Sequence, residues 1–327
     1  MAPARSLRAT LRRPGDALPR AAIGTVPILW NNVDLAELRL GTDALTILDE
    51  IARTGYEGTQ LGLGFPEGAA LRAALTERDL RLAEVYASLP ATAEGPTPDA
   101  LDLALERLRL LHAGGGELLC VALDLSPDRA ARAGRAAEPG TSVLTDAAWD
   151  ALVELLYTLS DAAAELGHSV VFHPHGGTFI ETPAEVDRLV AATDPVRIGI
   201  CLDVGHYLVG GGDPVDALER LGDRVRHVHL KDVDADVLRR LRAGEVDGFG
   251  AAIRQRLFTE LGAGMLDLDG VIASLAGRDY DGWLMVEQDS CWGPPSESAA
   301  IGRRVLAAAL HRAGTTASRR AGSVAAQ

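Results

Sequence analysis

The stretch SVVFHPH (residues 169–175) is a short run of β-branched and aromatic residues that ends in two histidines. The segment before it, WDALVELLYTLSDAAAELG (149–167), carries apolar residues at three- and four-residue steps and ends in glycine. The segment after it, PAEVDRLVAATD (183–194), has the same helical spacing. An apolar run between two amphipathic helices is typical of a strand in a parallel sheet, where helices connect successive strands.

Seven further apolar runs of this kind alternate with helical segments along the chain. They are GTVPILW (24–30), EGTQLGL (57–63), RLAEVYA (81–87), ELLCVAL (117–123), RIGICLD (197–203), VRHVHLK (225–231) and GWLMVEQ (282–288). Strands joined by helices imply parallel crossovers, and eight such strands close into a (β/α)₈ TIM barrel of the α/β class. An open doubly wound sheet is the alternative, but no GxGxxG or GxxxxGK phosphate loop follows an early strand.

The runs place a single barrel domain over residues 22–312. The segment before it, residues 1–21, is rich in arginine and nearly free of acids. A transit peptide has a similar composition, but such a segment is more often a disordered tail. Residues 313–327 are mostly small and polar, so we expect disordered tails at both ends of the chain.

The composition excludes several kinds of partner. The chain has 327 residues, 47% of them hydrophobic, and a formal net charge of −14. Nucleic-acid binding needs clustered Lys and Arg, so the acidic balance argues against it. No apolar stretch is long enough for a membrane span and no secretory signal is evident, so we expect a cytoplasmic protein. The three cysteines lie far apart, which favours reduced thiols over disulfides or a zinc knuckle.

Ionisable side chains stand at the carboxyl ends of four successive predicted strands. They are His173 and His175 on the fifth strand, Asp203 on the sixth, His229 and Lys231 on the seventh, and Glu287 on the eighth. In a barrel these ends meet on the face where active sites are built. A buried charge is costly unless it is paired or coordinates a metal. Histidine and carboxylate donors suit Mn²⁺, Co²⁺, Mg²⁺ or Zn²⁺, so a divalent metal cofactor is expected.

Several motifs at these strand ends resemble a known family. CLDVGH (201–206), RHVHLKD (226–232), FTELGAGMLDLDGVI (258–272) and YDGWLMVEQD (280–289) resemble the sugar phosphate isomerase/epimerase family, the xylose isomerase-like TIM barrels. Within it, GTVPILWNNVDLAEL (24–38), GYEGTQLGLGFPE (55–67) and HPHGGTFIETPAEVDRLV (173–190) are similar to the inosose dehydratases, also called 2-keto-myo-inositol dehydratases. The resemblance runs from about residue 22 to residue 310.

The resemblance implies how the metal is held. Family members typically bind it through Glu, Asp, His and Glu from strands five to eight, and Asp203, His229 and Glu287 match three of these positions. At the fifth-strand position this chain has His173, with His175 two residues on and facing the same way in an extended strand. One imidazole is expected to replace the ligand carboxylate while the other contacts substrate. Mn²⁺ or Co²⁺ is the expected ion, with Mg²⁺ and Zn²⁺ as alternatives.

The missing glutamate favours one reaction class within the family. Epimerases of the family move a proton between two glutamates, whereas an elimination needs one base beside a ketone and one acid at the departing hydroxyl. We expect His173 or His175, together with Glu287, to transfer protons around an enediolate that the metal stabilises. Lys231 would stabilise oxyanion charge, and His206 would bind a substrate hydroxyl.

Further candidates for substrate binding lie outside these strand ends. They are Trp30, Asn31, Asn32, Glu181 and Trp292. The alternative for Trp30 is a packed core side chain, followed by a turn formed by the two asparagines. Glu181 is an alternative base, or else a helix-capping residue. Trp292 would close the pocket or cap the barrel.

Two connections are long for a minimal barrel and follow strands on the catalytic face. Residues 124–148 are predicted to form a mobile lid, with plain disorder as the alternative. Residues 232–257 contain a short charged helix. Either loop could carry substrate selectivity or subunit contacts, so a homo-oligomer is left open.

These features predict a divalent-metal-dependent lyase that acts on a keto-polyol or sugar, of the inosose dehydratase type. Isomerisation or epimerisation of a ketose or keto-glycoside begins with the same enediolate and stays an alternative. A barrel endonuclease would need several metals and a basic groove, which the net charge opposes. A non-catalytic sugar-binding barrel is opposed by the intact ligands Asp203, His229 and Glu287.

Overall fold

Eight parallel strands form a closed barrel in the computed structural model, which describes residues 14–289 and 291–325. The strands are β1 (Ala22–Thr25), β2 (Gly58–Gln60), β3 (Arg81–Leu89), β6 (Leu118–Leu123), β7 (Ser169–Phe172), β8 (Ile198–Asp203), β9 (Val225–Leu230) and β12 (Trp283–Val286). They follow one another around the barrel in chain order, and β12 pairs with β1 to close it. Each strand overlaps one of the apolar runs. The predicted (β/α)₈ barrel is therefore confirmed, and the open sheet is excluded.

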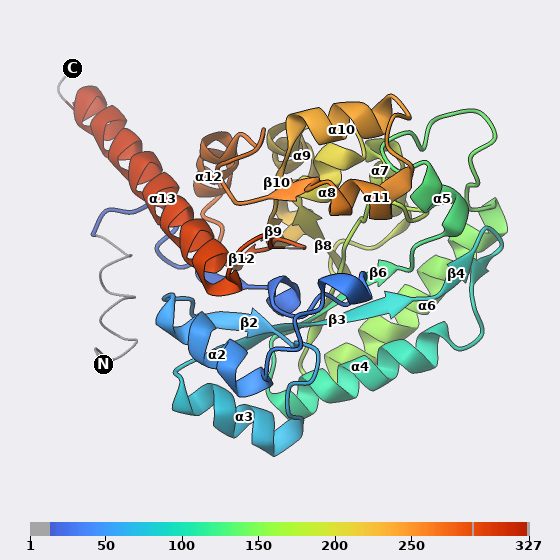
Figure 1. Cartoon of the computed structure of the whole chain (residues 1–327), viewed down its shortest axis with the longest axis horizontal. Coiled ribbons are helices and arrows are strands. Elements are labelled where there is room, and N and C mark those ends of the chain that lie inside the picture. The colour runs from blue at the N-terminus through green and yellow to red at the C-terminus, as the bar shows by residue number, and fades with distance from the viewer. Residues whose placement is uncertain (1–13, 290, 326–327) are drawn as a thin grey trace.

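A helix follows each strand on the outside of the barrel (Figure 1). These helices are α2 (Ala44–Arg53), α3 (Gly68–Glu77), α4 (Ala100–Gly114), α6 (Asp146–Glu165), α7 (Pro183–Ala192), α9 (Pro214–Leu221), α12 (Leu268–Ala276) and α13 (Pro295–Ala325). Their ends follow local sequence rules. Asp43 caps α2 by accepting from two backbone N–H groups, and α4 ends at Gly115 with a φ of 70°, which glycine adopts without strain.

Shorter elements fill the connections that leave the carboxyl ends of the strands. They are the hairpin of β4 (Ala91–Thr92) and β5 (Gly95–Pro96), helices α5 (Pro127–Ala131), α8 (Val204–Val209), α10 (Ala235–Arg242) and α11 (Gly248–Arg254), and the pair β10 (Asp232–Val233) and β11 (Phe258–Thr259). Helices α10 and α11 bury a second apolar cluster of their own, around Leu241 and Phe249. The connection after β9 is therefore a packed subdomain over the carboxyl face.

Strand β1 is shorter at its carboxyl end than the run GTVPILW suggests. It stops at Thr25, and Pro27 begins the 3₁₀ helix η1 (Pro27–Leu29). Proline has no N–H to give to a neighbouring strand, so it cannot continue the ladder. Trp30 therefore follows a 3₁₀ turn and not a strand.

The predicted tails are only partly described by the structure, because residues 1–13 and 326–327 lie outside the described ranges. In the first segment Leu18 is buried, and the N–H of Ala17 donates to the carbonyl of Leu310 (3.0 Å). In the second segment, helix α13 continues past residue 312 to Ala325 and projects away from the barrel (Figure 1). Ala and Arg are strong helix formers, and no proline interrupts residues 313–325. Disorder of the remainder of the two segments stays a prediction.

Among the described helices, none combines the length and the apolar character that crossing a membrane requires. This agrees with the absence of a long apolar stretch in the sequence.

Candidate metal centre and active site

Four side chains of the metal-ligating types meet at the carboxyl ends of β7, β8, β9 and β12. His173 follows directly after β7, and Asp203 is the last residue of β8. His229 lies near the end of β9, and Glu287 follows directly after β12. One donor atom from each lies within 4.8 Å of the others, and all four residues are buried. These are the four residues that the sequence predicts as ligands, and His175 is not among them.

The separations among the donor atoms suit a single ion. Nδ1 of His229 lies 2.7 Å from Oε2 of Glu287 and 3.8 Å from Oδ2 of Asp203. Nε2 of His173 lies 3.6 Å from the same oxygen of Asp203. Strands β8 and β9 pair in a register that sets Asp203 opposite His229, which puts their side chains at one level of the barrel.

Three of these donor atoms are buried without a hydrogen-bond partner. They are Oδ2 of Asp203, Nδ1 of His229 and Oε2 of Glu287. An unpaired buried polar atom costs about 1–3 kcal/mol, and more when it is charged. A divalent cation would coordinate all three, and a set of imidazole and carboxylate donors is one that such ions accept. The residues therefore fit a divalent metal ion.

Lys231 lies beside this group and is surrounded by carboxylates. Its Nζ is 3.1 Å from Oε1 of Glu287, 3.5 Å from Oδ2 of Asp203 and 2.6 Å from Oδ1 of Asp289. Burial alone would lower the pKa of this amine, but the negative charges of Asp203, Asp289 and Glu287 hold the pKa well above its usual range. Lys231 is therefore a buried cation next to two of the candidate ligands.

His175 and His206 form a pair of stacked imidazoles, with ring centroids 3.7 Å apart. Nδ1 of His175 donates to the carbonyl of Gly176 (2.8 Å), which leaves Nε2 without a proton when the ring is neutral. Nδ1 of His206 accepts the N–H of Gly176 (3.1 Å), so its ring proton lies on Nε2, 2.9 Å from Nζ of Lys231. Burial lowers the pKa of both imidazoles, and the charge of Lys231 lowers it further. Both rings are therefore neutral near pH 7.

Sequence reasoning missed two polar residues deeper in the barrel, Glu84 on β3 and His227 on β9, which are both fully buried. Oε1 of Glu84 lies 2.9 Å from Nε2 of His229, and Oε2 lies 3.2 Å from Nε2 of His227. A signal existed for Glu84, because it is an acid in the middle of the buried run RLAEVYA. Nothing in the sequence indicated which residues it would contact.

Two aspartates near Lys231 were also missed. Burial raises the pKa of Asp289 to about 7 against the opposing charge of Lys231. The pKa of Asp34 is raised as well, by desolvation from the surrounding protein and by the negative charge of Glu287, against the opposing charge of Lys231. Asn32 donates a side-chain hydrogen bond to the carbonyl of Asp289. The loop after β1 therefore lies close to the candidate site.

The other aromatic and amide candidates have partners within the protein. Trp30 is buried in the main core, and its Nε1 donates to Oε2 of Glu50 (2.5 Å). The side chain of Asn31 exchanges hydrogen bonds with the backbone of Thr42. Both observations fit the alternative of a core tryptophan followed by a turn. Trp292 is 37% exposed, and a role for any of the three in binding substrate stays a prediction.

Glu181 joins two loops next to the site. Its carboxylate accepts the N–H of Gly134 (2.7 Å) through Oε1 and the N–H of Gly177 (2.6 Å) through Oε2. The helix-cap alternative for Glu181 is wrong, because the N-cap of α7 is Thr182, paired with Glu185 in a capping box. Burial raises the pKa of Glu181 to about 7, although both backbone N–H groups oppose that rise.

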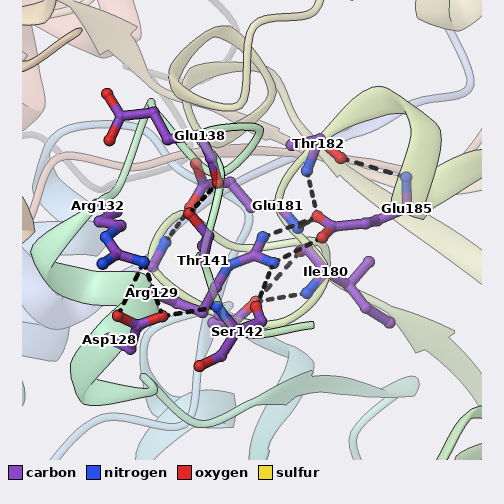
Figure 2. A network of polar contacts seen from close by, with 12 residues as sticks. Asp128, Arg129, Arg132, Glu138, Thr141, Ser142, Ile180, Glu181, Thr182 and Glu185 are labelled. Carbon is purple, nitrogen blue, oxygen red and sulfur yellow. Dashed lines mark hydrogen bonds and ion pairs between the residues drawn. The ribbon is translucent and has the colours of Figure 1, made fainter. Parts of the chain in front are cut away.

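The connection 124–148 is bound to α7 by a buried ion pair (Figure 2). Nη1 and Nη2 of Arg129 lie 2.7 and 2.9 Å from the two carboxylate oxygens of Glu185, and the Arg129 side chain is fully buried. Farther along the loop, the N–H of Ser142 donates to Oδ2 of Asp128 (2.7 Å). The connection has defined structure, including α5, so the alternative of plain disorder is wrong.

Comparison with known proteins agrees with this geometry. Residues 48–309 match the family described as the xylose isomerase-like TIM barrel. An inosose dehydratase of Geobacillus kaustophilus (strain HTA426) is 34% identical over 297 residues, which cover 88% of this chain and 94% of that protein.

Two solved structures share the fold at low sequence identity. An L-ribulose 3-epimerase has a TM-score of 0.67 at 16% identity and covers 94% of this chain and 98% of its own. A protein titled IolI, with a bound zinc atom, has a TM-score of 0.58 at 13% identity and covers 90% of this chain and 96% of its own. These two structures share only the fold, whereas the match over residues 48–309 shows that the chain belongs to the xylose isomerase-like TIM barrel family.

Proposed function

We propose that the protein is a divalent-metal-dependent dehydratase that eliminates water from inosose (2-keto-myo-inositol). The observation that carries this proposal is the 34% identity to an inosose dehydratase over 88% of the chain. The side chains at the carboxyl ends of β7, β8, β9 and β12 are of the types that the chemistry needs. A small polyol is therefore the proposed substrate.

His173, Asp203, His229 and Glu287 are the proposed metal ligands. When bound, a divalent ion supplies Lewis-acid stabilisation of the negative charge that develops on the ketone oxygen. Mn²⁺ or Co²⁺ is proposed over Mg²⁺, because two of the donors are imidazoles and Mg²⁺ prefers oxygen donors. Zn²⁺ accepts the same donors and is the ion named for the IolI structure.

His175 is the proposed proton-transfer group. In the elimination, a base takes the proton from the carbon beside the ketone, the hydroxyl on the next carbon leaves as water, and the resulting enol becomes a dione. The Nε2 atom of His175 carries no proton in the neutral ring, so it can accept that proton. The imidazolium that forms can return the proton to the departing hydroxyl, so no proton is left over.

Glu287 is less suited to the role of base, because both of its oxygens face other groups. Oε2 faces His229 within the ligand group, and Oε1 faces the ammonium of Lys231. Lys231 is proposed to stabilise negative charge on substrate oxygens, since three carboxylates keep it protonated.

His206 is proposed to donate to a substrate hydroxyl through Nε2–H. Its Nδ1 is already occupied by the N–H of Gly176. Lys231, as a cation, offers the Nε2–H no acceptor, although its Nζ is 2.9 Å away. A substrate oxygen that faces both groups from the same side would accept from both.

The proposal is tested by incubating the metal-reconstituted protein with 2-keto-myo-inositol in D₂O, removing the protein and recording the proton NMR spectrum. A dione product supports the dehydratase. Deuterium that enters the substrate without loss of a hydroxyl would make the protein an epimerase or isomerase instead. Asp203→Asn is the matched control, since it removes a ligand charge while keeping the side-chain shape. Failure of the wild type to convert inosose or any ketose of a panel would favour a non-catalytic sugar-binding barrel.

A further inference from the structure

Glu84 is a fully buried carboxylate that the proposed reaction does not use. It lies on β3, across the barrel interior from β9, and its neighbours there include the imidazoles of His227 and His229. A buried carboxylate needs compensating partners, since its desolvation is costly. The two imidazoles are cationic partners when protonated, and the Cys120 thiol lies beside the carboxylate as well.

The contact with His229 determines which nitrogen of that ring carries the proton. Oε1 of Glu84 lies 2.9 Å from Nε2 of His229 in hydrogen-bond geometry. A carboxylate accepts hydrogen bonds, so the proton of the neutral imidazole is on Nε2. The lone pair is then on Nδ1, the atom that lies 2.7 Å from Oε2 of Glu287 within the ligand group.

We propose that Glu84 is a positioning residue for the metal centre. Its carboxylate holds His229 in the tautomer and ring orientation in which Nδ1 binds the ion. This inference rests on the metal centre of the proposed function. A carboxylate that accepts from the second nitrogen of a ligating histidine fixes the ring and raises its basicity, and its loss typically lowers metal affinity about 10- to 100-fold.

The second oxygen of Glu84 makes the weaker of its two contacts. Oε2 lies 3.2 Å from Nε2 of His227, but neither atom is in hydrogen-bond geometry with a partner. The carboxylate is thus oriented for His229 and not for His227. Glu84 cannot itself join the ion at Nδ1 of His229, because it contacts the opposite edge of that ring.

Metal binding gives a direct test that does not depend on turnover. The affinity for Co²⁺ is measured by competition with a chromophoric chelator, and the visible absorption of the Co²⁺ protein reports on the ligand set. Glu84→Gln keeps the shape and one acceptor oxygen, whereas Glu84→Met removes both acceptors. Val85→Ala is the matched control, because it truncates the next residue on β3, which is fully buried in the main core on the opposite face of the strand.

We expect the dissociation constant for Co²⁺ to rise about 10-fold in Glu84→Gln and about 100-fold in Glu84→Met, with an altered spectrum in the latter. Val85→Ala should unfold at a lower temperature yet bind Co²⁺ as the wild type does. In the zinc-loaded wild type, ¹⁵N NMR of the histidine rings should show His229 protonated at Nε2.

Two results would overturn the inference in distinguishable ways. If the wild type binds Co²⁺ and Glu84→Met binds it equally well with the same spectrum, Glu84 has no positioning role and the metal centre stands. If the wild type binds neither Co²⁺ nor Zn²⁺, the metal centre of the proposed function fails and the role of Glu84 fails with it. Should Glu84→Met not fold, the affinity of Glu84→Gln decides.

Discussion

Oε1 of Glu287 lies 3.1 Å from Nζ of Lys231 inside the barrel, and both side chains are buried. Because the ammonium balances carboxylate charge and faces the proposed substrate position, Lys231→Met should reduce kcat/KM at least about 100-fold, or about 3 kcal/mol. Steady-state kinetics check this result, with metal content measured in parallel. Metal content near that of the wild type together with unchanged kcat/KM would rule out a catalytic role for Lys231.

His173 is proposed to bind the metal and His175 to transfer protons, so their variants should lose different properties. His173→Gln should lose metal affinity, because Nε2 of His173 belongs to the ligand group. His175→Gln should keep the metal and lose about 10²- to 10⁴-fold in kcat, the range for a lost general acid–base group. Elemental analysis and kinetics of both proteins provide the check. The reverse pattern would exchange the two assignments.

Glu181 should make stability depend on pH. Its pKa is raised from 4.5 to about 7 in the folded protein, so the folded state holds a proton that the unfolded chain releases. The resulting contribution of Glu181 to the free energy of unfolding is at most roughly 3 kcal/mol. It is fully present below pH 4.5 and is lost as the pH rises to about 7.

The check is the difference in unfolding free energy between the wild type and Glu181→Gln, measured by urea denaturation from pH 4.5 to 8. The unfolding free energy of the wild type minus that of the variant should fall as the pH rises, because only the wild type loses stability when Glu181 ionises. A constant difference would mean that the two backbone N–H groups keep Glu181 ionised throughout this range.

Arg129→Met should loosen the connection 124–148. It leaves the carboxylate of Glu185 without its buried partner, and removing one member of such a pair typically costs about 3–5 kcal/mol. Hydrogen exchange should accelerate over residues 124–145 and 173–182, while α12 on the far side keeps its protection. Equal exchange in the variant and the wild type would show that the ion pair does not hold the loop.

A divalent metal should stabilise the fold, because three buried donor atoms lack hydrogen-bond partners. At a free metal concentration 100 times the dissociation constant, the gain is about 2.7 kcal/mol, which thermal unfolding detects as a rise in Tm. Asp203→Asn should lose most of that rise. A chelator that leaves the Tm of the metal-loaded wild type unchanged would contradict the prediction.

The barrel was predictable because its strands are short apolar runs between helices, a local pattern. That Asp203, His229 and Glu287 lie close together was predictable as well, since they stand at strand ends, and parallel strands bring those ends to one face. His173 needed one further step, the comparison with the glutamate that relatives commonly place there.

The contact of Glu84 with His229 could not be predicted, because 145 residues separate them and no local pattern joins them. The ion pair of Arg129 and Glu185 was missed for the same reason, as 56 residues separate them. Trp30 was expected at the end of a strand, but Pro27 ends the ladder first. The sequence pattern thus predicts elements and their ends, whereas contacts across the barrel require the folded chain.

Lys231 is the only lysine in the chain, since every other residue counted with it as basic is arginine. Its amine is 1% exposed and surrounded by carboxylates. Amine-reactive dyes, biotin esters and activated surfaces should therefore not modify any lysine of the folded protein. Labelling by this chemistry would leave the carboxyl face of the barrel unmodified.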